Sequence, residues 1–185
     1  AVTGGAQGLG LAMAKGLAER GARLALIDMN AEPLEQAAAS LRELGVEVAT
    51  FVANVADEDS VIAAFDGIID QFGTLQGLIN NAGITRDGLM LKVKDGEVTD
   101  RMSLSQWQMV IDVNLTGVFL CGREAATRMI RAQSEGVIIN ISSIAGLIAS
   151  DTMPAYNSSK AAVWMLTKYP FAKIALSICP MRTFD

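Results

Sequence analysis

Tyr156 and Lys160 have the residue types and the spacing of an acid–base pair. They lie four residues apart in a segment that follows Pro154 and is predicted to be helical. This spacing places the phenol and the ammonium on one helix face. Because an unperturbed tyrosine ionises near pH ~10, proton exchange at neutral pH needs a nearby cation that favours the phenolate. Lys160 could supply that cation, although the same pair is also common on ordinary amphipathic helix surfaces.

A third polar group, Ser143, follows the apolar run VIINIS, which predicts a strand over Gly136–Ser142. Ser143 is therefore expected at the carboxyl end of a strand, where open α/β sheets bind their ligands. Its hydroxyl could donate a hydrogen bond to a carbonyl or an alcohol. Ser142 is a competing candidate, and two serines at a strand end also serve as turn caps.

A glycine-rich loop near the start of the chain has the pattern of a phosphate site. The segment TGGAQGLG follows a short predicted strand and opens a predicted helix. Glycines allow a tight turn and close approach of the backbone to a pyrophosphate, and the free N–H groups of a helix N-terminus favour an anion. A plain structural turn is the alternative. The predicted cofactor-binding residues in this loop are Gly4, Gln7, Gly8, Leu9 and Gly10.

Asp28 lies 18 residues after Gly10, at the end of the predicted second strand. A carboxylate at this position can accept hydrogen bonds from the ribose hydroxyls of an adenosine, and it repels a 2′-phosphate. No arginine stands in the neighbouring Met29-Asn30 to receive such a phosphate. The pattern therefore favours NAD(H) over NADP(H), unless Asp28 is only a strand-end cap.

The composition excludes several other kinds of site. The chain of 185 residues contains no histidine, so it can form neither a Ser-His-Asp triad nor a His-ligated metal site, and no metal is expected. Its net charge of −5 argues against a nucleic-acid partner. No apolar run reaches the ~18 residues of a membrane span. Cys121 and Cys179 stand alone as expected core thiols, and a cytoplasmic location is the default expectation.

These groups must be positioned by alternating strands and helices. Near-continuous apolar strands between amphipathic helices predict a doubly wound, parallel Rossmann-type α/β sheet in a single domain over residues 1–185. Expected helices run over Gly8–Arg20, from a cap at Asn30 to Gly45, from Asp57 to Gly73, from a capping box at Ser103 and Gln106 to Ala132, and onward from Pro154. Expected strands are Ala1–Thr3, Leu24–Asp28, Val46–Ala53, Gly77–Asn80, Gly136–Ser142 and Ile174–Cys179.

One long connection, Ile84–Met102, interrupts this alternation. Asp95-Gly96 lies between alternating residues, which is typical of a hairpin turn. Because loops of this length are often functional, we expect a small flap beside the ligand crevice.

Five motifs in this order resemble the short-chain dehydrogenase/reductase family from residue 1 to about Thr167. They are the TGxxxGxG loop, NNAG at residues 80–83, Asn114, Ser143 and Tyr156-x-x-x-Lys160. The tract NNAGITRDG is similar in particular to the 3-oxoacyl-(acyl carrier protein) reductase branch. Each motif is modest by itself, whereas all five together are specific.

The resemblance implies a role for each position. Tyr156 would protonate the substrate carbonyl, Lys160 would favour the phenolate and hold the nicotinamide ribose, and Ser143 would orient the carbonyl. Asn114 would hold a water that links Lys160 to solvent, or would only bond the backbone at a helix kink. The remaining cofactor contacts are expected from Asn54, Val55, Asn81, Ala82 and Gly83, with Asn54 standing where the family often has an aspartate.

The resemblance also implies an assembly and shows departures. Family members pair through two helices, here 103–132 and 154–168, so a homodimer or homotetramer is expected. Compared with the family, the chain has a short first strand and is expected to lack the last strand and the helical substrate lid. Pro170 is expected to end the Tyr-Lys helix, and Met181 replaces a glycine of the family's pattern.

Several functions remain open at this point. The preferred one is an NAD(H)-dependent oxidoreductase acting on a 3-oxoacyl or 3-hydroxyacyl thioester, with Arg123, Arg128 and Arg131 as a landing surface for an acidic carrier protein. Asp28 fits reductive biosynthesis poorly, because that usually draws on NADPH. A sugar-alcohol or steroid dehydrogenase, or a non-catalytic dinucleotide-binding module, is the alternative.

Overall fold

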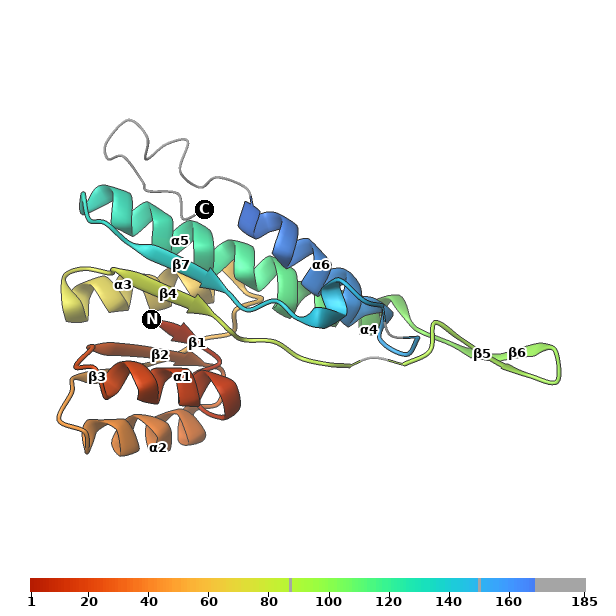
Figure 1. Cartoon of the computed structure of the whole chain (residues 1–185), viewed down its shortest axis with the longest axis horizontal. Helices are drawn as coiled ribbons and strands as arrows, with labels where there is room; N and C mark the ends of the chain where they lie inside the picture. Colours follow the sequence, from red (N-terminus) through yellow and green to blue (C-terminus); the bar gives the residue numbers. More distant parts are fainter. Residues whose placement is uncertain (87, 150, 169–185) are drawn as a thin grey trace.

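The computed structural model describes residues 1–86, 88–149 and 151–168. A five-stranded parallel sheet with the order β3-β2-β1-β4-β7 forms its centre (Figure 1). The strands are β1 (Val2–Thr3), β2 (Leu24–Asp28), β3 (Val48–Val52), β4 (Gly77–Asn80) and β7 (Val137–Asn140). The order reverses beside β1, which is the point where doubly wound sheets bind ligands.

Helices cover both faces of this sheet, as expected for a doubly wound fold. On one face, α1 (Gly8–Ala18) and α2 (Ala31–Arg42) bury an apolar cluster that includes Leu24 and Leu26 of β2. On the other face, α3 (Glu58–Phe72) and α5 (Gly117–Arg131) bury a second cluster that includes Ala25 and Ile27. Alternate residues of β2 thus enter opposite cores, because successive strand side chains point to opposite faces.

Helix ends follow the sequence signals at some positions and depart from them at others. The Asp57 carboxylate accepts a hydrogen bond from Ser60 N at 2.7 Å, and Gly73 ends α3 in the left-handed conformation with φ 73°. Asn30 precedes α2 without capping it, because its side chain donates to Asp28 Oδ1 instead. Ser103 caps α4 (Leu104–Ile111), but the Gln106 side chain donates to the Arg86 carbonyl rather than closing a capping box.

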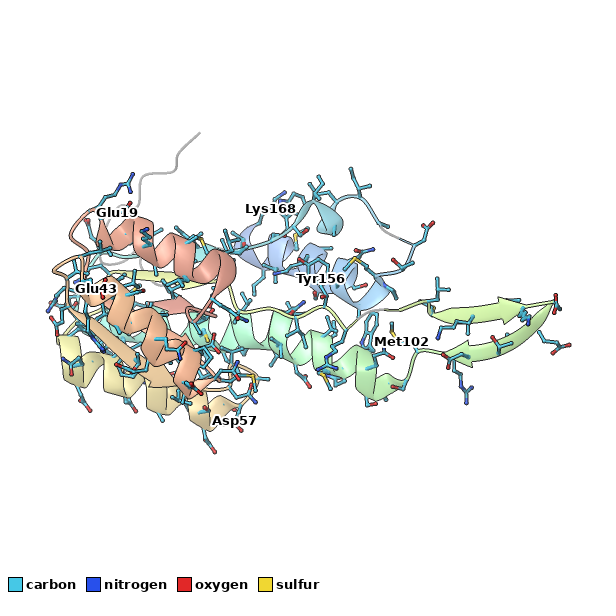
Figure 2. The ribbon with its side chains drawn as sticks, turned by 90° about the horizontal axis from the view of Figure 1, so that it is seen from below. Glu19, Glu43, Asp57, Met102, Tyr156 and Lys168 are labelled. Atoms are coloured by element: carbon cyan, nitrogen blue, oxygen red, sulfur yellow. The ribbon has the colours of Figure 1, made fainter. Side chains whose placement is uncertain are left out.

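The long helix expected over 103–132 is interrupted. Between α4 and α5, residues Asp112–Thr116 form a π-helical turn, which contains the buried Asn114. Such turns widen the helix locally and are frequent at functional sites. α6 (Pro154–Lys168) packs beside this turn and carries Tyr156 near its start (Figure 2).

The long connection does contain the predicted hairpin. Strands β5 (Leu91–Lys94) and β6 (Glu97–Arg101) pair antiparallel around Asp95 and Gly96, which have φ of 51° and 84°. Every residue of both strands is exposed, and the hairpin projects away from the body of the molecule (Figures 1 and 2). The predicted hairpin is confirmed, but no residue of β5 or β6 is among the described residues that line the pocket at the carboxyl end of the sheet, so a flap beside the ligand crevice stays a prediction.

The features predicted after residue 168 lie outside the described residues, whereas the prediction for Cys121 can be compared with the structure. The predicted strand Ile174–Cys179, Pro170, Cys179 and Met181 lie outside the described residues. Cys121 is a core thiol, and burial raises its pKa to about 12. In the described part of the chain, no helix combines the length and the hydropathy needed to cross a membrane.

Candidate active site

The glycine-rich loop is held in a shape that side chains would not permit. Gly4 and Gly8 have φ of 65° and 57°, a region that residues with a Cβ rarely adopt. A Cβ on Gly10 would lie 2.1 Å from the Gly4 carbonyl oxygen and 2.7 Å from Asn81 Nδ2. The start of α1 is thus packed directly against the loop and against the segment that follows β4.

The N-terminus of α1 leaves its amide groups available for an anion. Gln7 occupies the cap position, and its side chain makes no capping hydrogen bond. A Cβ added to Gly8 would meet no atom within 4 Å, so the loop is open at this residue. Gly8 and Leu9 lie exposed beside the pocket described next, while Gly10 is buried beneath the loop. An uncapped helix start and an open glycine cradle fit a pyrophosphate.

Thr3 ties this loop to the segment after β4. Its hydroxyl oxygen accepts hydrogen bonds from Asn81 N and Ala82 N, both at 3.0 Å. The Asn81 amide in turn donates to the Thr3 carbonyl at 3.1 Å and to the Gly4 carbonyl at 3.3 Å. Sequence reasoning missed this role of Thr3, because its partners lie 78 and 79 residues away.

A pocket of about 360 Å³ opens at the carboxyl end of the sheet. It brings together seven of the predicted cofactor residues: Gly4, Gln7, Asp28, Asn54 and the run Asn81–Gly83. Val55 lines it as well, packed against Gly117, where a Cβ would lie 2.9 Å from Val55 Cγ2. The further lining residues, which sequence reasoning did not single out, are Ile27, Met29, Asn30, Ala53, Ile84 and Val113.

Asp28 is oriented toward the pocket by its neighbours. Its Oδ1 accepts hydrogen bonds from Asn30 N at 3.1 Å and Asn30 Nδ2 at 3.2 Å, and its Oδ2 accepts a long bond of 3.4 Å from Ala6 N. Among the described residues that line the pocket, Asp28 is the one acidic residue and none is basic. The Asn54 side chain is engaged in a local turn, since its Oδ1 accepts from Ala56 N at 3.1 Å.

Lys160 is the buried cation of the candidate catalytic group. It is 4% exposed, and its Nζ donates to the Ile141 carbonyl at 2.8 Å and lies 5.7 Å from the centre of the Tyr156 ring. Burial lowers the pKa of Lys160. A Cβ on Gly83 would lie 3.7 Å from Lys160 Nζ, so the ammonium sits directly beside the pocket wall.

The two serines at the end of β7 have different roles. Ser142 Oγ donates to the Lys160 carbonyl at 2.8 Å and thereby fixes α6. Ser143 Oγ accepts from Ala145 N at 3.1 Å, which leaves its own hydrogen available to donate. Ser143 also begins the short 3₁₀ turn Ile144–Gly146. A Cβ on Gly146 would lie 2.7 Å from Ala161 N, so this glycine lets the turn rest on α6.

Asn114 joins three parts of the site. It is 0% exposed, its Oδ1 accepts from Ile84 N at 2.8 Å, and its Nδ2 donates to the Ile84 carbonyl at 2.9 Å and to Ser159 Oγ at 3.2 Å. The side chain therefore bonds backbone, as one interpretation of the sequence expected, but that backbone belongs to the segment after Gly83. Ser159 was missed, because no local signal distinguishes it from other helical serines.

Asn114→Ala is expected to destabilise the fold by about 2–4 kcal/mol, because it leaves the Ile84 N–H and C=O without buried partners. Urea unfolding followed by circular dichroism measures this loss, and Asn157→Ala on α6 serves as an asparagine comparison. A change below about 0.5 kcal/mol would show that water replaces the amide without cost.

The proposed carrier-protein surface is not supported. Arg128 is 7% exposed and forms ion pairs with Asp66 and Glu124, both at 2.6 Å. Arg123 is paired with Glu58 at 2.7 Å and with Glu124 at 2.8 Å. Because these carboxylates neutralise two of the three arginines, the helix face offers no strong positive field.

The family model for the short chain dehydrogenases matches residues 1–175. The chain belongs to the short-chain dehydrogenase family. The similarity extends to curated members that carry out different reactions. The 3-oxoacyl-(acyl-carrier-protein) reductase of Staphylococcus aureus is 39% identical over 94% of this chain and 67% of its own. The cis-4-hydroxycyclohexanecarboxylate dehydrogenase of Sinomonas cyclohexanicum is 40% identical over 90% of this chain and 63% of its own.

Solved structures of the family have the same fold. An NAD⁺-bound xylitol dehydrogenase superposes with a TM-score of 0.81 at 37% identity, over 96% of this chain and 63% of that one. A short-chain dehydrogenase/reductase from Burkholderia phymatum in complex with NAD has a TM-score of 0.85 at 31% identity, over 95% and 59%. The chain thus spans about two thirds of the length of the relatives it matches.

Proposed function

We propose that the chain is an oxidoreductase that transfers a hydride between NAD(H) and a secondary alcohol or ketone. One arrangement supports this most: Lys160 Nζ lies 5.7 Å from the centre of the Tyr156 ring and beside Gly83 of the pocket wall, and Ser143 begins the turn that rests on the same helix, α6. Membership of the family supports the reaction class. A dinucleotide-binding module would need the pocket alone and would have no use for this trio.

Each residue of the trio has a separate task in this proposal. Ser143 donates its hydroxyl hydrogen to the substrate carbonyl and orients it. Tyr156 delivers a proton to the carbonyl oxygen during reduction and takes it back during oxidation. Lys160, held against Ile141 by its hydrogen bond, brings a positive charge to 5.7 Å from the centre of the Tyr156 ring. The bound nicotinamide supplies or accepts the hydride.

The glycine loop and the pocket fit a dinucleotide. The pyrophosphate would lie on Gly8 and Leu9 at the start of α1, the adenosine ribose on Asp28, and the adenine between Asn54, Val55 and Ala82. Gly83 and Lys160 would hold the nicotinamide end. The open cradle at Gly8 and the uncapped helix support this assignment.

We infer NAD(H) as the preferred cofactor from the charge of the pocket. A 2′-phosphate would meet the Asp28 carboxylate and no compensating cation among the lining residues. Two structures to which this fold is similar contain NAD.

Asp28→Ala is expected to weaken NADH binding by about 10- to 100-fold, since hydrogen bonds to a charged acceptor contribute about 1.5–3 kcal/mol. The same change should strengthen NADPH binding, because it removes the repulsion of the 2′-phosphate. Fluorescence titration of both cofactors measures the two effects, with Asp59→Ala as the control at an exposed aspartate outside the pocket. If the unaltered chain bound NADPH more tightly than NADH, the cofactor assignment would be wrong.

We propose a 3-oxoacyl or 3-hydroxyacyl thioester as the substrate, on the basis of NNAGITRDG and of the Staphylococcus aureus relative. The likeness to the xylitol dehydrogenase keeps a sugar alcohol as a second candidate. An NADH-consumption assay with acetoacetyl-coenzyme A and with xylulose separates the two.

We also propose that the chain forms a homo-oligomer through α4, α5 and α6. Met109 of α4, Phe119 of α5 and the neighbours Trp164 and Met165 of α6 are large apolar side chains that remain exposed in the single chain. Exposed apolar residues that gather on adjoining helices are typical of protein interfaces.

A further inference from the structure

A second hollow lies near the dinucleotide pocket and near the start of the helix that carries Tyr156. Its volume is about 560 Å³, and it is lined by Thr85, Arg86, Gly88, Gln106, Thr152 and Met153. One wall continues from Ile84, which lines the dinucleotide pocket, and the other wall leads into α6. The hollow is therefore connected through both walls to the segments that carry the candidate catalytic residues.

The wall that carries Arg86 is fixed by a hydrogen bond. Gln106 of α4 donates its Nε2 hydrogen to the Arg86 carbonyl at 2.7 Å. On the preceding residues, the bonds from Asn114 to Ile84 hold the same segment from the other side. The segment from Ile84 to Arg86 is thus held at both of its ends, by Asn114 at Ile84 and by Gln106 at the Arg86 carbonyl.

Arg86 supplies a positive charge to the lining of this hollow. Within the described residues the Arg86 guanidinium takes part in no ion pair and no side-chain hydrogen bond. Among the described residues that line the hollow, none is acidic. Arg23, Arg42, Arg123 and Arg128, by contrast, are each paired with a carboxylate. In a chain of net charge −5, this unpaired arginine makes the hollow locally favourable for an anion.

The distance from Arg86 to the reacting centre suits a substrate of moderate length. Arg86 follows Gly83 by three residues, and Met153 precedes Tyr156 by three. Three extended residues span at most about 10 Å, so both walls connect the hollow to the catalytic groups within that distance. Thr85 and Thr152 add hydroxyl groups to the same lining.

We propose that Arg86 binds an anionic group of the substrate, a carboxylate or a phosphate, and so selects acidic ketones and alcohols over neutral ones. This inference rests on the proposed oxidoreductase function and specifies its substrate class. The planar guanidinium pairs with either anion through two parallel N–H bonds, which fixes the direction of the substrate as well as its charge.

Two matched pairs of ketones test this selection. The first pair is 4-oxocyclohexanecarboxylate and its methyl ester, and the second is acetoacetyl-coenzyme A and acetoacetyl-N-acetylcysteamine. Within each pair the reacting carbonyl is the same; the first pair differs in the charge of its carboxyl group, and the second differs in the phosphate-bearing nucleotide part of coenzyme A. Arg86→Met is expected to lower kcat/KM about tenfold or more for an acidic member and to leave its neutral counterpart within about twofold. Loss confined to the first pair identifies a carboxylate, and loss confined to the second identifies a phosphate.

Two further variants control the experiment. Arg86→Lys should retain part of the preference for acidic ketones, because lysine keeps the positive charge but lacks the planar guanidinium that can make two parallel hydrogen bonds. Arg101→Met, at an exposed arginine of the hairpin, should change neither pair. Equal losses on acidic and neutral ketones, or no loss on any acidic one, would overturn the proposal.

A binding measurement separates this inference from the proposed function. Equilibrium dialysis of 4-oxocyclohexanecarboxylate and of coenzyme A with the NADH-loaded chain should show that Arg86→Met weakens binding of at least one of them about tenfold. If no ketone is turned over but this difference is found, the oxidoreductase function fails and the anion site stands. If Arg86→Met changes the binding of neither anion, the anion site is wrong whatever the activity.

Discussion

Tyr156→Phe is expected to lower the turnover of a ketone by about 10²- to 10⁴-fold, the usual contribution of a positioned general acid. The change removes one oxygen and leaves the ring on α6, beside Lys160. NADH binding should remain within about twofold, because the dinucleotide pocket is lined by other residues. Stopped-flow measurement of NADH oxidation under single-turnover conditions detects the loss in the chemical step itself.

Thermal unfolding of Tyr156→Phe and of the unaltered chain shows whether the loss of turnover comes from the chemical step or from misfolding. The midpoint of thermal unfolding should be nearly the same in both forms, so that misfolding does not account for the loss. Turnover within about threefold of the unaltered chain would refute Tyr156 as the proton donor. In that case the non-catalytic dinucleotide-binding module would become the better description.

The second large effect is expected at the glycine loop. Gly10→Ala places a methyl group 2.1 Å from the Gly4 carbonyl oxygen, which is backbone, and 2.7 Å from Asn81 Nδ2, which is held by hydrogen bonds to the Thr3 and Gly4 carbonyls. The start of α1 must therefore move away from the loop. We expect NADH affinity to fall more than about 100-fold and the stability to fall by about 2–4 kcal/mol, as for other overpacked buried sites.

Gly16→Ala is the matched control for this change. Gly16 lies on the same helix, and a Cβ there would meet only the end of the Arg20 side chain, at 3.8 Å. Because alanine is the better helix former, this variant should be more stable by about 0.5–1 kcal/mol and should bind NADH as before. Titration and urea unfolding of the two variants side by side distinguish close packing of the loop from a general effect of alanine in α1. Gly10→Ala with unchanged NADH affinity would show that the loop does not hold the cofactor.

Local patterns in the sequence were sufficient for most of the fold. Alternating apolar runs and capping signals predicted β2, β4, α3 and α6 within a few residues, because burial and helix termination depend on nearby residue types. The hairpin at Asp95-Gly96 was predicted for the same reason, since its turn requires two residues that tolerate positive φ. The position of the hairpin in space was not predicted, because no local sequence signal fixes the direction in which an exposed hairpin projects.

The sequence also determined the chemical identity of the site. The absence of histidine, the Tyr156–Lys160 spacing, Ser143 at a strand end and Asp28 after β2 together indicated nicotinamide-dependent chemistry. Only the tertiary structure decided how these groups are held. Thr3 bonded to Asn81, Asn114 bonded to Ile84, and Gly146 resting on α6 are contacts between residues 15 to 78 positions apart. The tertiary structure likewise showed that Arg128 is buried and paired with Asp66, whereas Arg86 forms no ion pair within the part of the chain that the structure describes. Residue types reveal which reactions are possible, but hydrogen-bond partners, burial and ion pairing depend on which distant segments the fold brings together.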